Sequence, residues 1–142
     1  MLEMVCVLAT VALLAAVCLP RLAPATSQAR LEAYAYEVAT LLKADRNAAV
    51  ERGSAVAAVV DAPGRRIRSG SGLRPIRIPD DVVFDALLPE RCNGRPALST
   101  ISFLPTGMSC GGTLRLTRAD TGFEVRVNWL TGDVDIVAQS TH

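Results

Sequence analysis

The side chains that could carry out chemistry are few, and they do not form a catalytic set. His142, the single histidine, ends the chain, and the sequence has no Gly-x-Ser-x-Gly motif and no basic partner for a serine or cysteine nucleophile. The four cysteines contain no Cys-x-x-Cys pair, so a metal site has no support. Gly70-x-Gly72 is not a dinucleotide fingerprint, because Pro75 takes the place of the third glycine. We therefore expect no enzyme activity, no metal and no cofactor.

Glu3 is a carboxylate at the border of an apolar run. The run Met4–Leu19 carries no charge and, with its apolar neighbours, approaches the roughly 17 to 25 residues that cross a bilayer as a helix. Residues 1–25 are therefore a candidate membrane segment. A carboxylate at the edge of the hydrocarbon layer is costly unless it is paired. Near a helix start it is also favoured by the helix dipole, so buried pairing and simple capping are both open.

Five arginines lie between residues 65 and 77 with no acidic residue among them, namely Arg65, Arg66, Arg68, Arg74 and Arg77. Such a cluster can contact an acidic partner or phosphate, and the glycines at 70 and 72 predict a mobile loop. The alternative is a solvated hairpin, since three aspartates follow closely. The net charge is +1 and residues 133–142 hold no lysine or arginine, which disfavours nucleic acid as a partner.

Residues 26–53 have the pattern of an amphipathic helix. Apolar residues recur at helical spacing, at Leu31, Tyr34, Ala35, Val38, Leu41, Leu42, Ala48 and Ala49. Gly53 is placed to end the helix, and Thr26 or Ser27 can cap a fresh start after the kink that Pro20 predicts. A helix from Leu2 to Arg52 would be about 75 Å long, so we expect a stalk with a head.

Residues 54–142 have the pattern of a strand-rich head. Thr113–Arg118, Phe123–Trp129 and Asp133–Val137 alternate apolar and polar residues, with hairpin turns expected at 120–122 and 130–132. Shorter strand candidates lie at 55–60, 66–68, 75–78, 82–84 and 100–104. The fold class is therefore α+β, a long N-terminal helix packed on an antiparallel β-sandwich.

Several stretches of the chain are similar to the motifs of one protein family. The opening Leu2-Glu3-Met4-Val5, with Pro20 downstream, resembles the N-terminal helix of type IV pilins and pseudopilins. Three further stretches are residues 41–53, the glycine pair within Ile101–Leu114, and the Leu-Thr-Gly turn within Val127–Val134. They resemble the GspH/FimT family, the H-type minor pseudopilins of the type II (general) secretion system. The resemblance implies a pilin-like fold and covers nearly the whole chain.

The resemblance also implies how such a chain is processed. In that family a basic leader ending in glycine precedes the helix, and a prepilin peptidase cleaves it and N-methylates the new N-terminus. We expect this chain to begin at an internal Met, with that leader upstream. Glu3 would then neutralise the terminal amine of a neighbouring subunit, and Pro20 would kink the helix.

The implied location is the inner membrane of a Gram-negative bacterium, crossed once, with the head in the periplasm. In that oxidising compartment Cys92 and Cys110 can form a disulfide worth about 3 kcal/mol. Whether the two reach each other across the intervening strand stays open. Cys6 and Cys18 lie in the apolar run, where cysteine behaves as a small hydrophobe.

The function that the resemblance implies is structural. A minor pseudopilin sits near the tip of the periplasmic pseudopilus and helps drive folded proteins across the outer membrane. Its partners would be the major pseudopilin, the minor tip pseudopilins, the prepilin peptidase and the inner membrane. One alternative is a minor pilin of a type IV pilus, acting in assembly or DNA uptake. Another is a secreted binding domain cleaved after Ala25.

Overall fold

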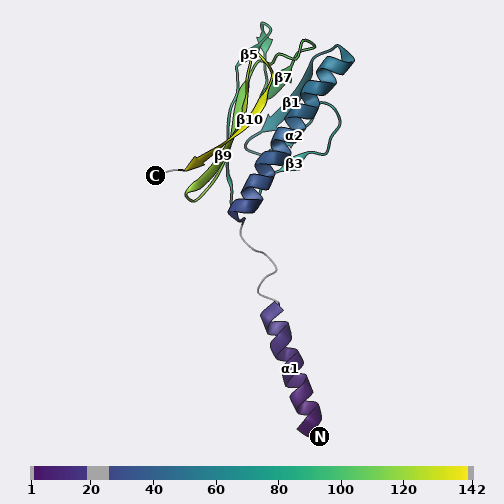
Figure 1. Cartoon of the computed structure of the whole chain (residues 1–142), viewed down its shortest axis with the longest axis vertical. Helices are drawn as coiled ribbons and strands as arrows, with labels where there is room; N and C mark the ends of the chain where they lie inside the picture. Colours follow the sequence, from purple (N-terminus) through teal and green to yellow (C-terminus); the bar gives the residue numbers. More distant parts are fainter. Residues whose placement is uncertain (1, 19–25, 141–142) are drawn as a thin grey trace.

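The computed structural model describes residues 2–18 and 26–140. Two helices come first, α1 (Leu2–Cys18) and α2 (Gln28–Arg52). The strands that follow are β1 (Val56–Asp61), β2 (Arg66–Arg68), β3 (Ile76–Arg77), β4 (Val83–Leu87), β5 (Arg91–Cys92), β6 (Arg95–Pro96), β7 (Thr100–Phe103), β8 (Gly112–Arg118), β9 (Thr121–Val127) and β10 (Val134–Ser140). The α+β prediction is confirmed, because α2 lies against antiparallel sheets (Figure 1).

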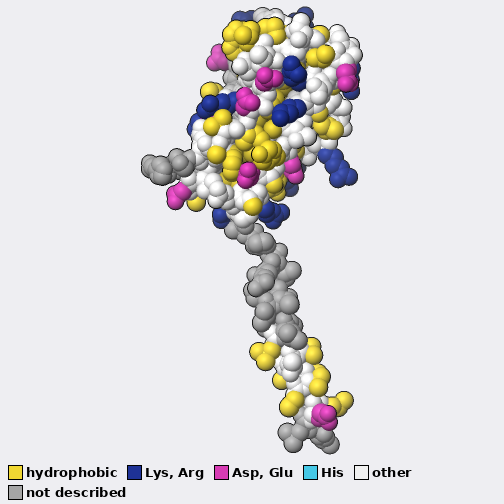
Figure 2. Space-filling view, in the orientation of Figure 1, with side chains coloured by type: hydrophobic (Ala, Val, Ile, Leu, Met, Phe, Trp, Pro, Cys, Tyr) yellow, Lys and Arg dark blue, Asp and Glu magenta, His cyan; other side chains and the backbone are white. Residues whose placement is uncertain are grey.

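α1 lies apart from the head (Figure 1). The side chains of residues 3–13 are all exposed, and Figure 2 shows apolar side chains along this part of the helix. Neither helix, within the described ranges, combines the length and apolar character required to cross a membrane. The predicted kink at Pro20 falls in the segment 19–25, outside the described residues.

α2 begins and ends at the predicted capping residues. Ser27 is extended (φ −79°, ψ 166°), and its Oγ accepts the backbone N–H of Arg30 at 3.2 Å. Gly53 adopts the left-handed conformation (φ 64°) and donates its N–H to Ala49. The helix therefore does not run unbroken from residue 2 to residue 52, since Ser27 starts a new helix.

One face of α2 forms the centre of the core. Its buried residues are Leu31, Ala35, Val38, Ala39, Leu41, Leu42, Asp45, Ala48 and Ala49, which include every predicted stripe residue except the partly buried Tyr34. This face touches β1 and β7 on one side and β8, β9 and β10 on the other. α2 thus joins the two sheets into one hydrophobic unit.

The first sheet has the strand order β3-β2-β1-β7, and the second has β10-β9-β8-β4. All pairings in these two sheets are antiparallel. For the last three strands, the sequence pattern predicted this arrangement. Fully buried residues of both sheets, among them Ile67, Ile101, Phe103, Leu114 and Val125, fill the space beneath α2. The predicted three-stranded meander is confirmed as β8-β9-β10, and β4 extends it.

The first hairpin turn of this meander was predicted one residue too late. Arg118 pairs with Thr121, so Ala119 and Asp120 alone form the turn, and Gly122 lies within β9 opposite Thr117. Ala119 takes the left-handed conformation (φ 53°) that such short turns require. The glycine that suggested the turn is therefore a strand residue.

A disulfide joins Cys92 to Cys110, with a Cα–Cα distance of 5.6 Å. Cys92 belongs to the small β5–β6 hairpin, which sequence analysis did not predict, and Cys110 shortly precedes β8. The bridge ties the hairpin to the second sheet, the pairing that the sequence had left open.

Candidate functional site

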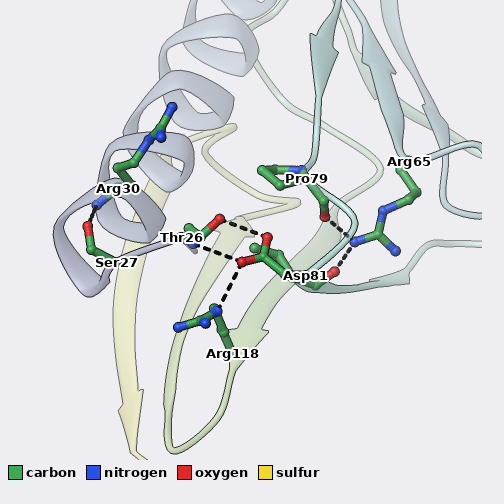
Figure 3. A network of polar contacts seen from close by, with 8 residues as sticks. Thr26, Ser27, Arg30, Arg65, Pro79, Asp81 and Arg118 are labelled. Carbon is green, nitrogen blue, oxygen red and sulfur yellow. Dashed lines mark hydrogen bonds and ion pairs between the residues drawn. The ribbon is translucent and has the colours of Figure 1, made fainter. Parts of the chain in front are cut away.

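The N-terminus of α2 is fastened to the second sheet by one carboxylate, Asp81 (Figure 3). The backbone N–H and hydroxyl of Thr26 each donate to Asp81 at 2.8 Å, and Arg118 Nε lies 3.1 Å from Oδ2. The two Thr26 hydrogen bonds, helped by the charge of Arg118, hold the pKa of Asp81 below its ordinary value. These contacts tie the start of α2 to Asp81, which precedes β4, and to Arg118 on β8.

Arg65 is half-buried and forms bonds within the head, and its predicted contact with a partner stays a prediction. Its guanidinium donates to the carbonyls of Pro79 and Val82, and its Nε lies 3.7 Å from Asp80 (Figure 3). Arg65 has a positive φ of 57°, and its side chain contacts the connection between the two sheets. Arg65 therefore holds the crossover in place.

The other four predicted arginines are exposed on the first sheet or the loop beside it. Arg66 and Arg68 flank the buried Ile67 on β2, and Arg77 lies opposite Arg66 on β3. Arg74 lies in the loop between those strands. Their contact with a partner stays a prediction, and the structure gathers three of them on one sheet face.

The loop that carries two glycines is held in place. Asp45 of α2 is fully buried, and its carboxylate accepts the hydroxyls of Ser69 and Ser71 at 2.6 Å each. It also accepts the backbone N–H of Gly70 at 2.9 Å. A Cβ at residue 70 would overlap the Ala57 carbonyl, so this position needs glycine for close approach. The expectation that this loop is mobile is corrected by these bonds.

The turn between β9 and β10 presents two apolar side chains on a rigid frame. Trp129 is 62% exposed and Leu130 is 57% exposed. The Asn128 side chain accepts the N–H of Leu130 at 2.8 Å, and Arg46 donates to the Thr131 carbonyl at 3.1 Å. Gly132 is left-handed (φ 74°), and any Cβ there would overlap the backbone of residue 107. A preorganised exposed tryptophan is typical of protein–protein contacts.

A second buried carboxylate links three strands of the second sheet, β8, β9 and β10. Glu124 of β9 pairs with Arg115 at 3.2 Å and with Arg126, and it accepts the side-chain amide of Gln139. The hydrogen bond from Arg126, and after it that from Arg115, hold the pKa of Glu124 below its ordinary value. Arg115 and Arg126 are therefore engaged in ion pairs within the head, whereas Arg66 forms none among the described residues.

Glu3 lies in the first turn of α1 and is exposed. Within the described parts of the chain it forms no ion pair. A helix N-terminus favours a carboxylate at this place, and its predicted pairing with a neighbouring subunit stays a prediction.

Together, an N-terminal helix and a second helix packed on antiparallel sheets match the pilin-like fold of two solved structures. The minor pseudopilin EpsH from the type 2 secretion system of Vibrio cholerae matches with a TM-score of 0.60 and 15% identity, over 76% of this chain and 96% of that chain. The type IV minor pilin FimU of Pseudomonas aeruginosa PAO1 matches with a TM-score of 0.54 and 16% identity, over 80% and 92%.

These two likenesses confirm the fold that the sequence resemblance implied, and both neighbours are pilin-type subunits rather than enzymes. No family model matches the sequence, and a search of the curated proteins finds no match. At these identities the likeness establishes the fold.

Proposed function

We propose that this chain is a minor pseudopilin of a type II secretion system. It would be a structural subunit near the tip of the periplasmic pseudopilus, helping to drive folded proteins across the outer membrane. The observation that carries the proposal is an exposed apolar helix with one carboxylate, Glu3, attached to a head of pilin-like fold.

In this proposal, α1 rests in the inner membrane before assembly and packs among the helices of neighbouring subunits afterwards. Apolar side chains that their own head leaves uncovered need lipid or other apolar chains around them. Glu3 neutralises the terminal amine of the next subunit, since a charge in that setting requires a partner. The Asp81 junction keeps the head in a fixed orientation on α2 while the filament grows.

A periplasmic location fits the disulfide. Bridges such as Cys92–Cys110 persist in oxidising compartments and are rare in the cytosol. The proposed precursor is longer, with a basic leader that a prepilin peptidase removes before N-methylation. The mature chain would cross the inner membrane once.

A minor pilin of a type IV pilus is the second candidate, and the likeness to FimU favours it. The two candidates share the fold, the anchor and the role of Glu3. They differ in which filament the subunit joins. Neighbouring subunits, rather than any residue of this chain, distinguish them.

The first test is N-terminal sequencing and intact-mass analysis of the protein expressed from its own locus, with upstream codons included. A methylated start two residues before Met1 is expected. A start at Thr26 would mean signal-peptidase cleavage and would overturn the filament role.

The second test compares Glu3→Ala with Glu51→Ala, an exposed glutamate at the end of α2. We expect Glu3→Ala to abolish cross-linking to neighbouring subunits and export of secreted proteins, while Glu51→Ala behaves as wild type. Loss of surface pili with intact export would assign the chain to a type IV pilus. Normal assembly of Glu3→Ala would refute the pairing role.

A further inference from the structure

The last strand, β10, has an open edge. It pairs with β9 on one side and with no strand on the other among the described residues. Asn128 donates its backbone N–H to the carbonyl of Asp133 at 2.9 Å, so these two residues are a hydrogen-bonded pair of the β9–β10 ladder. Bonded and non-bonded pairs alternate along an antiparallel ladder. Val134, Ile136 and Ala138 therefore direct their backbone groups away from β9.

The other sheet edges of the described head are shorter or covered. None of the hydrogen bonds within residues 2–18 and 26–140 uses the outward backbone groups of β10. On the outer side of β7, by contrast, Cys110 donates its N–H to the carbonyl of Ser102 at 3.3 Å. β3 has two residues, and β4 has five, of which Ala86 lines a groove shared with Val59 of the first sheet. β10 is thus the longest open edge of the part described.

β10 also lacks the devices that commonly block a sheet edge, which are short strands, bulges, proline and lysine. It has seven residues, with no proline, lysine or arginine. Its register with β9 runs without interruption from Val134 to Ser140. Asp135 is its one charged residue. An open edge of this kind is a template on which another protein can add a strand.

The side chains beside this edge define the chemistry of a ligand. Ile136 is half-buried and packs against the core, so the inner face of β10 is apolar there. A hollow beside the start of β10 is lined by Lys43 and Arg46 of α2 and by Asp133 and Asp135. The two positive and two negative side chains balance each other. The surroundings of the edge therefore favour neither an acidic nor a basic ligand.

We propose that β10 binds an extended, uncharged strand of a partner protein, added antiparallel to its open edge. The incoming main chain exchanges hydrogen bonds with Val134, Ile136 and Ala138. Directly opposite residues of a strand pair share one face of the sheet. The incoming residues that bond to β10 therefore place apolar side chains beside Ile136, and the residues between them lie on the outer face with Asp135. This inference concerns the head, goes beyond the filament role and does not depend on it.

The test uses the full chain in detergent micelles, with protein-free micelles as the blank. The probe is a fluorescein-labelled peptide of alternating threonine and valine, seven residues long, followed by fluorescence anisotropy. Two comparison peptides have the same sequence. One carries N-methyl groups on its valine amides and the other carries them on its threonine amides, so each lacks the hydrogen-bond donors of one edge.

We expect N-methylation of the valines to weaken binding by about tenfold or more, because the valine amides are those that face β10. N-methylation of the threonines should leave binding unchanged. Ala138→Pro removes an outward N–H without touching the pairing with β9 and should also weaken binding by about tenfold. The matched control Ala138→Thr keeps the N–H and should bind as wild type. Circular dichroism checks that both variants keep their strands.

Failure of the unmodified peptide to bind would overturn the proposal, as would equal losses for the two methylated peptides. Should Ala138→Pro unfold, the methylated pair decides the question on the wild-type chain. Sedimentation of the chain without peptide tests the competing occupant. Dimers that Ala138→Pro dissociates, together with no peptide binding, would overturn the proposal and indicate a second copy of the chain at this edge.

Discussion

The two helices of this chain have opposite surroundings. α2 is capped at both ends and buries one face against two sheets. α1 exposes the side chains of residues 3–13, with Met4 at 76% and Leu8 at 69%. Both helices carry leucine, valine and alanine side chains. In α2 the protein itself buries one face of these side chains, whereas in α1 they are exposed. α2 is part of the core of the head, whereas the apolar side chains of α1 are available for contacts outside the chain.

One carboxylate in each helix shows the same difference in burial. Asp45 of α2 is fully buried and accepts hydrogen bonds from Ser69, Gly70 and Ser71. Glu3 of α1 is exposed, and its predicted partner belongs to another chain. A buried charge without partners costs far more than an exposed one, so removing the two groups should have unequal consequences.

Replacing a leucine in each helix should give the largest contrast. Leu42→Ala in α2 removes a side chain that is 0% exposed and should lower the free energy of unfolding by about 3 kcal/mol. Leu8→Ala in α1 should change it by less than about 0.5 kcal/mol. Urea unfolding of the full chain in detergent, followed by circular dichroism of the strands, measures both. Equal losses would mean that α1 packs against the head.

The carboxylates should give the next contrast. Asp45→Ala leaves two hydroxyls and two backbone N–H groups without their acceptor and should cost about 2 kcal/mol. It should also open the loop after β2 to limited proteolysis. Glu3→Ala should leave both readouts unchanged, as should Glu32→Ala on the exposed face of α2. An intact loop in Asp45→Ala would contradict its role as the anchor.

The parts of this comparison that sequence could predict are those governed by local rules. The helical spacing of apolar residues located α2, and its ends lie at Gly53 and at Ser27, one of the two predicted N-caps. Alternation located β8, β9 and β10, where one face of the sheet is buried. These signals depend on neighbours within a few residues, which the sequence displays directly.

The polar contacts of Asp45 and Arg65 could not be predicted, because their hydrogen-bond partners are distant in sequence. Asp45 accepts bonds from residues 69–71, and only its place in the stripe 38, 42, 45, 49 hinted at burial. In the sequence, Arg65 looks like the neighbouring arginines. In the structure it has a positive φ and bonds to the carbonyl of Val82, which is distant in sequence. The β5–β6 hairpin has two residues in each strand, too few for an alternating pattern, and a disulfide links it to Cys110.

The acid sensitivity of the head should give the smallest contrast. Asp81 and Glu124 have pKa values below their ordinary range, the first because Thr26 donates to it and the second because Arg126 and Arg115 do. The unfolded chain therefore takes up these protons at higher pH than the folded chain does. The stabilisation is complete above about pH 5 and is lost as the pH falls through the folded pKa values.

Thermal unfolding between pH 7 and pH 3 checks this sign. The wild-type midpoint should fall on acidification. Asp81→Asn and Glu124→Gln should start lower at pH 7 and fall less, because the charge that acid removes is already absent. Glu3→Gln should follow the wild-type curve, since this exposed side chain forms no ion pair within the described residues. A flattened curve for Glu3→Gln would place that carboxylate against the head and remove the distinction between the two helices.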